Sequence, residues 1–219
     1  MSTSTKPQGR GLVMAAVFIA TFMTSVEVTI VTTALPAIIS DLHGLAYQSW
    51  IMSAYLLTTA ITTPIYGKLA DTLGRRGVFQ WGVVLFTLGT LLSGLAPHIL
   101  LLILARALQG IGAGAVMPLT FTIIADYYDF AHRANVLALN NTAWGLSALV
   151  GPLIGGFLVD QLSWHWVFFV NVPLGILVFG LIQVGYREPR REHVSLTIDW
   201  LGIAWLAVTL VALLLGIQA

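Results

Sequence analysis

Long apolar stretches separated by short polar segments constrain this chain more than any other feature of its sequence. They cover seven ranges: 12–39, 46–66, 78–96, 99–125, 135–159, 166–185 and 198–218. A helix needs about 20 apolar residues to cross the hydrocarbon core of a bilayer, whereas a membrane strand uses about 9–11. Backbone groups in that core must form their hydrogen bonds internally, and helices satisfy this over such long runs. We therefore predict an all-α, polytopic transmembrane helical bundle.

The composition agrees with membrane insertion and excludes several classes of function. Of the 219 residues, 58% are hydrophobic and 9% are charged, whereas soluble proteins carry about 25% charged residues. A soluble enzyme is therefore excluded, and we expect no enzymatic activity. The net charge of +1 gives no basis for a nucleic-acid partner. The chain has no cysteine, and its five histidines lack metal-ligand spacing, so we expect no metal site and no cofactor.

Lysine and arginine residues predict the orientation of the chain, because cytoplasmic loops carry an excess of them. All but one of the ten fall in segments that lie on the same side of the predicted bundle: Lys6, Arg10, Lys68, Arg75, Arg76, Arg133, Arg187, Arg190 and Arg191. We expect a multi-pass protein of the cytoplasmic membrane with a cytoplasmic N-terminus. Residues 1–11 form a cytoplasmic tail, 12–186 a six-helix unit, 187–197 a cytoplasmic loop and 198–219 a seventh span.

Two charged residues remain inside the predicted spans. At about 1.5 Å per residue, Glu27 lies roughly 20 Å from either end of the first span, and Arg106 about 10 Å from the outer end of the fourth. A charge at the bilayer centre costs about 2.5–3.5 kcal/mol on insertion scales, so it usually faces protein or water and has a function. We interpret Glu27 as a proton carrier, since a proton and an approaching cation would compete for one carboxylate. A permanently paired structural carboxylate is the alternative.

Arg106 has three possible roles from its position alone. It positions Glu27 or polar partners such as Gln109 and Asn140, it holds a substrate directly, or it extends toward the outer interface.

The segment between the second and third spans has glycines, an acid and two bases at fixed offsets. Residues 67–76 read G-K-L-A-D-T-L-G-R-R. This resembles the signature loop of the major facilitator superfamily, usually written G-x-L-A-D-(R/K)-x-G-R-(R/K), from which Thr72 departs. The resemblance implies a cytoplasmic gating motif in which the first arginine pairs with an acid at the end of the fourth span. The implied gating residues are Gly67, Asp71, Gly74, Arg75, Arg76 and Asp126. The alternative is topological positive charge with an exposed ion pair worth about 0–1 kcal/mol.

Two further patterns resemble the same family. Residues 106–113, R-A-L-Q-G-I-G-A, are similar to its fourth-span pattern R-x-x-Q-G-x-G-A, which implies a proton-coupling role for Arg106 and Gln109. Residues 151–156, G-P-L-I-G-G, are similar to a fifth-span element associated with antiporters, although two glycines of its longer form are missing here. The antiporter residues would be Gly151, Pro152, Gly155 and Gly156. Ordinary packing of small residues is the alternative.

Several shorter patterns are similar to the EmrB/QacA-like drug/proton antiporter branch, whose members have fourteen spans. They are E-V-T-I from Glu27, A-L-P from Ala34, W-H-W from Trp164, F-V-N-V-P-L-G from Phe169 and D-W-L-G from Asp199. The branch usually has Asp where Glu27 stands. The resemblance implies an N-terminal half of six helices plus one further span, with a C-terminal half or a second copy as its partner.

The resemblance also implies a function. It predicts a proton-coupled transporter that exports hydrophobic or cationic small molecules, with protons and the lipid bilayer as its other partners. Asn140 and Trp144 are candidates for the substrate cavity, because an aromatic ring at depth can stack on a flat cation. Two alternatives stay open: the same fold carrying a metabolite, osmolyte or lipid, and a membrane fragment or regulatory partner that does not transport.

Overall fold

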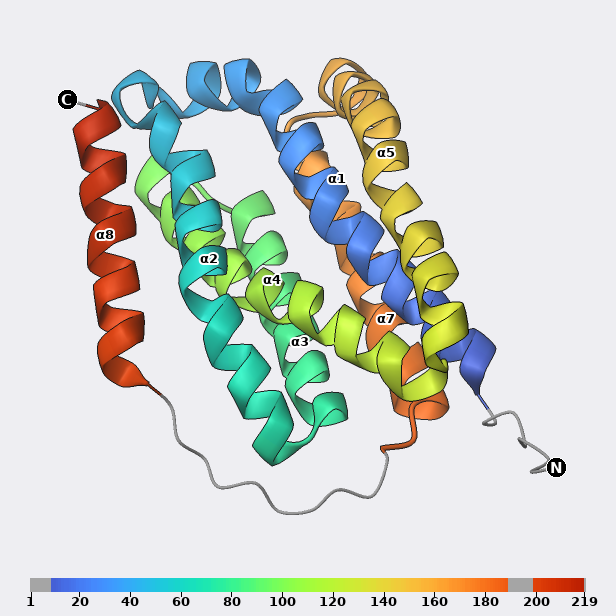
Figure 1. The fold of residues 1–219 in the computed structure, drawn as a ribbon. Helices are drawn as coiled ribbons and strands as arrows, with labels where there is room; N and C mark the ends of the chain where they lie inside the picture. Colours follow the sequence, from blue (N-terminus) through green and yellow to red (C-terminus); the bar gives the residue numbers. More distant parts are fainter. Residues whose placement is uncertain (1–8, 189–198, 219) are drawn as a thin grey trace, which may run out of the picture.

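The computed structural model describes residues 9–188 and 199–218, and nearly all of these are helical, which confirms the predicted fold class (Figure 1). The described elements are α1 (Arg10–Leu42), the short 3-10 helix η1 (Leu45–Tyr47), α2 (Gln48–Leu73), α3 (Arg75–Gly94), α4 (Ile99–Tyr127), α5 (Phe130–Gln161), α6 (Trp166–Phe169), α7 (Asn171–Gly185) and α8 (Trp200–Gln218). Most of the predicted tail 1–11 and of the predicted loop 187–197 lies outside the described residues.

Five of the described helical stretches are long and apolar enough to cross a membrane: α1, α3, α4, α5 and the run Trp166–Gly185 formed by α6 and α7. The apolar part of α8 is shorter, at Trp200–Leu213. α2 has 26 residues but is less apolar, because it carries several threonines. Their hydroxyls donate to carbonyls one turn earlier, as in Thr58 to Ala54 and Thr62 to Thr58, at 2.8 and 2.7 Å. These polar groups are therefore satisfied within the helix and do not prevent its burial.

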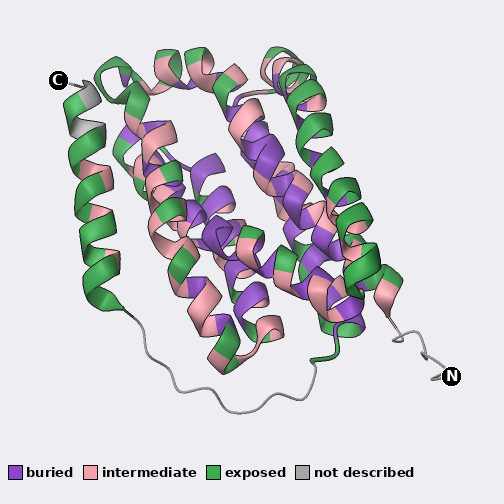
Figure 2. Ribbon diagram, in the orientation of Figure 1, coloured by how far each residue is buried: buried purple, intermediate pink, exposed green. Residues whose placement is uncertain are grey.

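The helices form a bundle whose core runs along α1 and α4. α4 packs against α2 and α3, α1 packs against α5 and α7, and α8 lies beside α2 (Figure 1). Buried residues concentrate on the inward faces of α1 and α4, while α5 and α8 are mostly exposed (Figure 2). The exposed side of α5 is apolar and includes Leu139, Leu149, Leu153 and Phe157. An exposed apolar surface of this kind marks a membrane or protein interface.

Close contact between α3 and α4 fixes the position of the middle of α4. A Cβ on Gly112 would collide with the backbone of Phe86, and a Cβ on Gly89 would collide with the backbone of Gln109. Small residues let two helix backbones approach in this way. The middle of α4 is therefore held tightly against α3, while Arg106 reaches Glu27 of α1 and Ile51 of α2.

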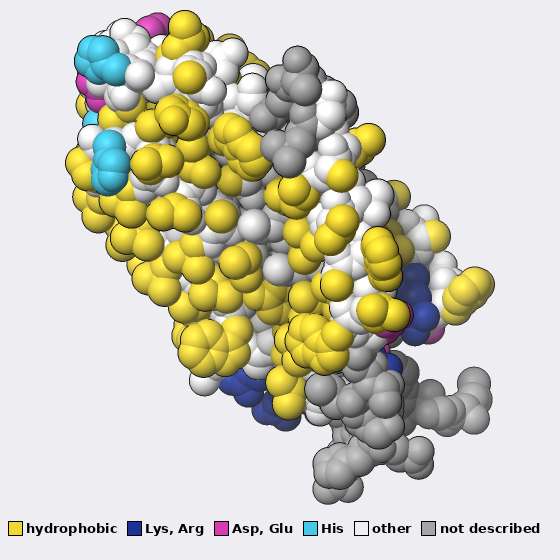
Figure 3. Space-filling view, turned by 90° about the vertical axis from the view of Figure 1, so that its left-hand side faces the viewer, with side chains coloured by type: hydrophobic (Ala, Val, Ile, Leu, Met, Phe, Trp, Pro, Cys, Tyr) yellow, Lys and Arg dark blue, Asp and Glu magenta, His cyan; other side chains and the backbone are white. Residues whose placement is uncertain are grey.

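Charged side chains are segregated along the bundle. On the face drawn in Figure 3, hydrophobic side chains cover the middle, Lys and Arg gather toward one end and His toward the other. This distribution suits a helical bundle with an apolar belt and two chemically different ends.

Candidate functional site

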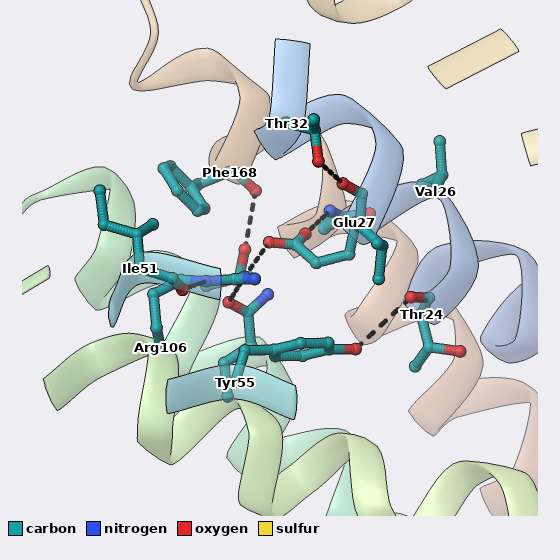
Figure 4. A network of polar contacts seen from close by, with 12 residues as sticks. Thr24, Val26, Glu27, Thr32, Ile51, Tyr55, Arg106 and Phe168 are labelled. Carbon is teal, nitrogen blue, oxygen red and sulfur yellow. Dashed lines mark hydrogen bonds and ion pairs between the residues drawn. The ribbon is translucent and has the colours of Figure 1, made fainter. Parts of the chain in front are cut away.

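A fully buried ion pair joins the two charges that lie inside the predicted spans. Nη1 of Arg106 on α4 donates a hydrogen bond to Oε1 of Glu27 on α1 (Figure 4). The side chains of both residues are 0% exposed. The alternative in which Arg106 extends to the outer interface is therefore wrong, because the guanidinium points into the bundle.

Two further helices contribute hydrogen bonds to this ion pair. Arg106 donates through Nη1 to Oε1 of Gln109 at 2.6 Å and through Nε to the carbonyl of Ile51 on α2 at 3.2 Å. Asn171, the first residue of α7, donates through Nδ2 to Oε2 of Glu27 at 2.5 Å. A buried charge is tolerated when it is paired and when its remaining hydrogen-bonding atoms are used. Four helices thus cooperate to hold one carboxylate and one guanidinium.

Aromatic rings surround the guanidinium. The Cζ atom of Arg106 lies 4.4 Å from the centre of the Tyr55 ring and 5.9 Å from that of Phe168, within the reach of about 6 Å typical of cation–π contacts. The hydroxyl of Tyr55 donates to the carbonyl of Thr24 on α1 at 3.4 Å (Figure 4). Tyr55 therefore connects the ion pair to the backbone of α1 one turn away from Glu27.

Three polar atoms beside the pair have no hydrogen-bond partner among the described residues: Nη2 of Arg106, Nε2 of Gln109 and Oδ1 of Asn171. A buried polar group without a partner costs about 1–3 kcal/mol. These buried donors and acceptor are therefore left unused by the described residues.

The proposed cavity residues Asn140 and Trp144 belong to a separate hollow. Asn140 donates through Nδ2 to Oγ1 of Thr21 at 3.2 Å, so the expected contact between Arg106 and Asn140 is not formed. The hollow lies between α1, α4 and α5 and has an empty volume of about 310 Å³, including the space at its mouth. Its lining residues are Thr21, Thr24, Val116, Met117, Thr120, Phe121, Asn140, Asn141 and Trp144. The lining consists of hydroxyl, amide, aromatic and aliphatic groups and contains no charged side chain.

The gating motif is more helical than the sequence suggested. Gly67 and the exposed Asp71 lie within α2, so the predicted loop is reduced to a turn at Gly74. Gly74 has a φ of 99°, which lies in the left-handed region that glycine adopts without a steric penalty. α3 begins immediately after this turn and brings both arginines of the motif onto its first turn.

Arg75 makes the ion pair that the resemblance implies. Its Nη1 donates to Oδ1 of Asp126 at the end of α4 and to the carbonyl of Thr122 at 3.1 Å. The hydroxyl of Tyr186 donates to the other carboxylate oxygen of Asp126 at 2.7 Å. Burial, followed by this hydrogen bond, raises the pKa of Tyr186 above its usual value. The contact exists as predicted, and its role in gating stays a prediction.

The G-P-L-I-G-G segment of α5, residues 151–156, divides between two faces of the helix. A Cβ on Gly151 would collide with Oγ1 of Thr29 on α1, and one on Gly155 would come within 3.1 Å of Ile30. Pro152 is exposed, and a Cβ on Gly156 would meet nothing within 4 Å. Two of the four residues therefore make the close contact with α1, and the other two face away from it.

Asn171, Tyr55 and Phe168 are parts of the site that the sequence analysis did not identify. Asn171 had a usable signal, because it is a polar residue within the long apolar run of the sixth predicted span. Tyr55 and Phe168 had none, since aromatic residues are common in membrane helices and only the fold shows which of them face a charge. The described residues contain no group of three or more His, Asp or Glu side chains that could hold a metal ion.

Comparisons with known proteins give one consistent family. Residues 17–217 match the Major Facilitator Superfamily. The chain is 40% identical over 218 residues to the multidrug transporter protein MdtP of Bacillus subtilis (strain 168), covering 100% of this chain and 40% of that protein. It is 36% identical over 217 residues to multidrug resistance protein 3 of the same organism, covering 99% of this chain and 42% of that protein. The chain thus spans about two fifths of the length of these relatives.

The structural comparison agrees at the level of the fold. The crystal structure of the human organic anion transporter MFSD10 (TETRAN) superimposes with a TM-score of 0.73 and 19% sequence identity, covering 90% of this chain and 53% of that one.

Proposed function

Because the chain belongs to the major facilitator superfamily, a family of membrane transporters, we propose that it is part of a proton-coupled secondary transporter that exports hydrophobic or cationic drugs. The names of its relatives MdtP and multidrug resistance protein 3 support the cargo class. The observation that carries the proposal is the fully buried Glu27–Arg106 ion pair with its unused hydrogen-bonding atoms.

A count of charges explains how such a site exchanges protons for cations. Ionised Glu27 and Arg106 sum to zero, and either a proton or a monovalent cationic substrate brings the site to +1. Both together bring it to +2. Two like charges about 4 Å apart repel by about 4 kcal/mol at an effective dielectric constant of 20. Proton and cation therefore exclude one another, and this mutual exclusion is the basis of antiport.

The hollow that contains Asn140 and Trp144 is suited to the uncharged part of a substrate. Its amide and hydroxyl groups offer hydrogen bonds, and Trp144, which is 42% exposed, offers a ring face. Thr24 lines this hollow and accepts the hydrogen bond of Tyr55, which in turn stacks on Arg106. A substrate that displaces α1 at Thr24 would therefore act on the ion pair through Tyr55.

The proposed setting is the cytoplasmic membrane, with the N-terminus and the Arg75–Asp126 pair on the cytoplasmic side. The distribution of Lys and Arg supports this orientation. We propose further that the chain corresponds to the N-terminal half of its relatives and that a C-terminal half, or a second copy, covers the exposed apolar side of α5. In this arrangement the Arg75–Asp126 pair stabilises the outward-facing state.

Efflux of a cationic fluorescent dye from energised cells tests the proposal. The chain is expressed alone and extended by a C-terminal half, each with Glu27 intact, with Glu27→Gln and with Glu27→Asp. We expect proton-dependent efflux for the extended chain, its loss in Glu27→Gln and its partial retention in Glu27→Asp, which keeps the titratable group. Membrane abundance of each variant is matched by immunoblot. Full efflux in the extended Glu27→Gln protein would remove the proton-carrier role.

A further inference from the structure

α3 and α7 enclose a continuous apolar groove on their exposed surface. Two adjoining hollows with empty volumes of about 610 and 470 Å³ share Val84 of α3 and Phe179 of α7 as lining residues. Trp81 at one end is 67% exposed, and Ile176 at the other is 66% exposed. The groove therefore opens outward from the bundle, away from the buried ion pair.

We infer that this groove holds an acyl chain of an anionic phospholipid whose headgroup lies at Arg76. The inference rests on the proposed membrane orientation, in which the first turn of α3 faces the cytoplasmic leaflet. It does not depend on the transported substrate or on proton coupling.

The dimensions of the groove match one lipid chain. Along α3 it runs from Gly77 to Leu88, which corresponds to about 17 Å at about 1.5 Å per residue. One leaflet of the hydrocarbon core is about 15 Å thick, half of the full core. The groove therefore extends from the membrane interface to the middle of the bilayer, as a single acyl chain does.

The polar groups in the groove are arranged to leave an apolar interior. The hydroxyl of Thr87 donates to the carbonyl of Val83 at 2.7 Å, and Nε2 of Gln80 donates to Oε1 of Gln183 at 2.8 Å. The hydrogen-bonded amides of Gln80 and Gln183 lie at the end of the groove nearest the first turn of α3. The rest of the groove is lined mainly by aliphatic and aromatic groups.

A glycine sets the floor of the groove. A Cβ on Gly175 would collide with Oγ1 of Thr87, so glycine is what permits α7 to approach α3 at this level. Gly175 ends the F-V-N-V-P-L-G pattern, of which the ion-pair network uses only Asn171. Gly175, the last residue of the pattern, thus serves the packing of α7 against α3 and takes no part in the ion-pair network.

Arg76 supplies the positive charge at the cytoplasmic end, where the carboxylate of Glu188 accepts a hydrogen bond from the backbone N–H of Arg75. Arg75 is bound to Asp126, but Arg76 donates one N–H, from Nη2, to the carbonyl of Gln183 at 2.6 Å. A guanidinium has five N–H donors, so others can reach a phosphate. Trp81 lies one turn further into the membrane, where Trp side chains usually meet lipid headgroups. Basic pockets between transmembrane helices on the cytoplasmic side bind anionic headgroups for the same reasons.

Native mass spectrometry of the detergent-solubilised chain with phosphatidylglycerol or phosphatidylcholine tests headgroup and chain separately. We expect one retained phosphatidylglycerol and a preference over phosphatidylcholine of about fivefold, which is the effect of about 1 kcal/mol per basic residue. Arg76→Gln should abolish the preference, and Val84→Phe, which fills the groove, should reduce retention of both lipids. Arg133→Gln on α5 and Leu92→Phe, further along α3, are matched controls that should keep the lipid.

Quenching of tryptophan fluorescence by brominated lipids is an independent test of lipid binding in nanodiscs. Both ends of the bundle face the same lipid there, so the result does not depend on orientation. The difference between the parent chain and Trp81→Phe isolates the Trp81 signal. Brominated phosphatidylglycerol should quench this signal more strongly than brominated phosphatidylcholine, and Arg76→Gln should equalise the two. Equal retention and equal quenching by both lipids in the parent chain would overturn the inference, and so would loss of binding in the control variants. Because neither assay requires transport, a failure here is distinct from a failure of the proposed function.

Discussion

Removing one partner of the Glu27–Arg106 pair should destabilise the fold far more than removing both. Both side chains are 0% exposed, and among the described residues no second carboxylate forms an ion pair with the guanidinium. Breaking a buried ion pair at one partner costs about 3–5 kcal/mol, because the remaining charge is left uncompensated. Replacing the whole pair by uncharged side chains of similar volume is often close to neutral.

The two single variants should differ in a diagnostic way. In Glu27→Gln the guanidinium stays charged, because arginine is not deprotonated in proteins. We therefore expect the full loss of about 3–5 kcal/mol wherever Glu27 of the parent chain is ionised. In Arg106→Met the carboxyl of Glu27 can become neutral by taking up a proton. The loss of stability in this variant should therefore shrink as the pH is lowered. The double variant should recover most of the stability, so the magnitude of the coupling energy should approach the sum of the two single losses.

Unfolding of the purified chain in mixed micelles, with tryptophan fluorescence as the signal, measures these four free energies. Independent sites add to within about 0.3–0.5 kcal/mol, so a double-mutant cycle separates a true pair from two unrelated losses. Glu27→Asp serves as the control that keeps the charge. Additive losses, or an Arg106→Met loss that does not change with pH, would refute the reasoning.

Three further predictions concern packing, backbone conformation and pH. Gly151→Leu should destabilise the chain by about 1–3 kcal/mol through overpacking against α1, while Gly156→Leu should leave the midpoint of unfolding in the same micelles nearly unchanged. Gly74→Ala should cost about 1–2 kcal/mol or more in the same assay, because its φ of 99° is unfavourable for a residue with a Cβ, and Gly77→Ala is the matched helical control. Tyr186 has a raised pKa in the fold, so its stabilising contribution is complete below the unfolded-state pKa of about 10 and is lost at higher pH. Tyr186→Phe should therefore flatten the loss of stability in an unfolding series above that pH.

The sequence was sufficient for the architecture because hydrophobic length is read directly from it. Each predicted span is helical, the sixth as α6 and α7 together, and the main error concerns residues 67–76. A short polar segment with two glycines suggests a loop. Gly67 nevertheless lies within α2, because the residues on either side of it favour helix. The turn is confined to Gly74, whose positive φ is unfavourable for a residue with a Cβ.

The site was predictable where a residue carried a charge and not where it was neutral. Glu27 and Arg106 were identified because a charge at depth is costly and requires a reason. That they pair with each other depended on the relative rotation of α1 and α4, which a sequence does not specify. Asn140 illustrates this: it has the same polarity as Asn171, yet Asn140 faces Thr21 and Asn171 faces Glu27.

The contacts of α1 suggest how the buried carboxylate becomes accessible. On one side α1 meets α4 and α7 through the directional hydrogen bonds of Glu27, and these cannot stretch without being lost. On the other side it meets α5 at Gly151 and Gly155 and through neutral hydrogen bonds, from Thr29 to the carbonyl of Ser147 and from Asn140 to Thr21. A neutral hydrogen bond contributes about 0.5–1.5 kcal/mol, whereas an ion pair in a low-dielectric interior strongly resists separation. Neutralising Glu27 by a proton removes the larger of these two resistances. The proposed exchange therefore assigns the moving contact to α1 against α4.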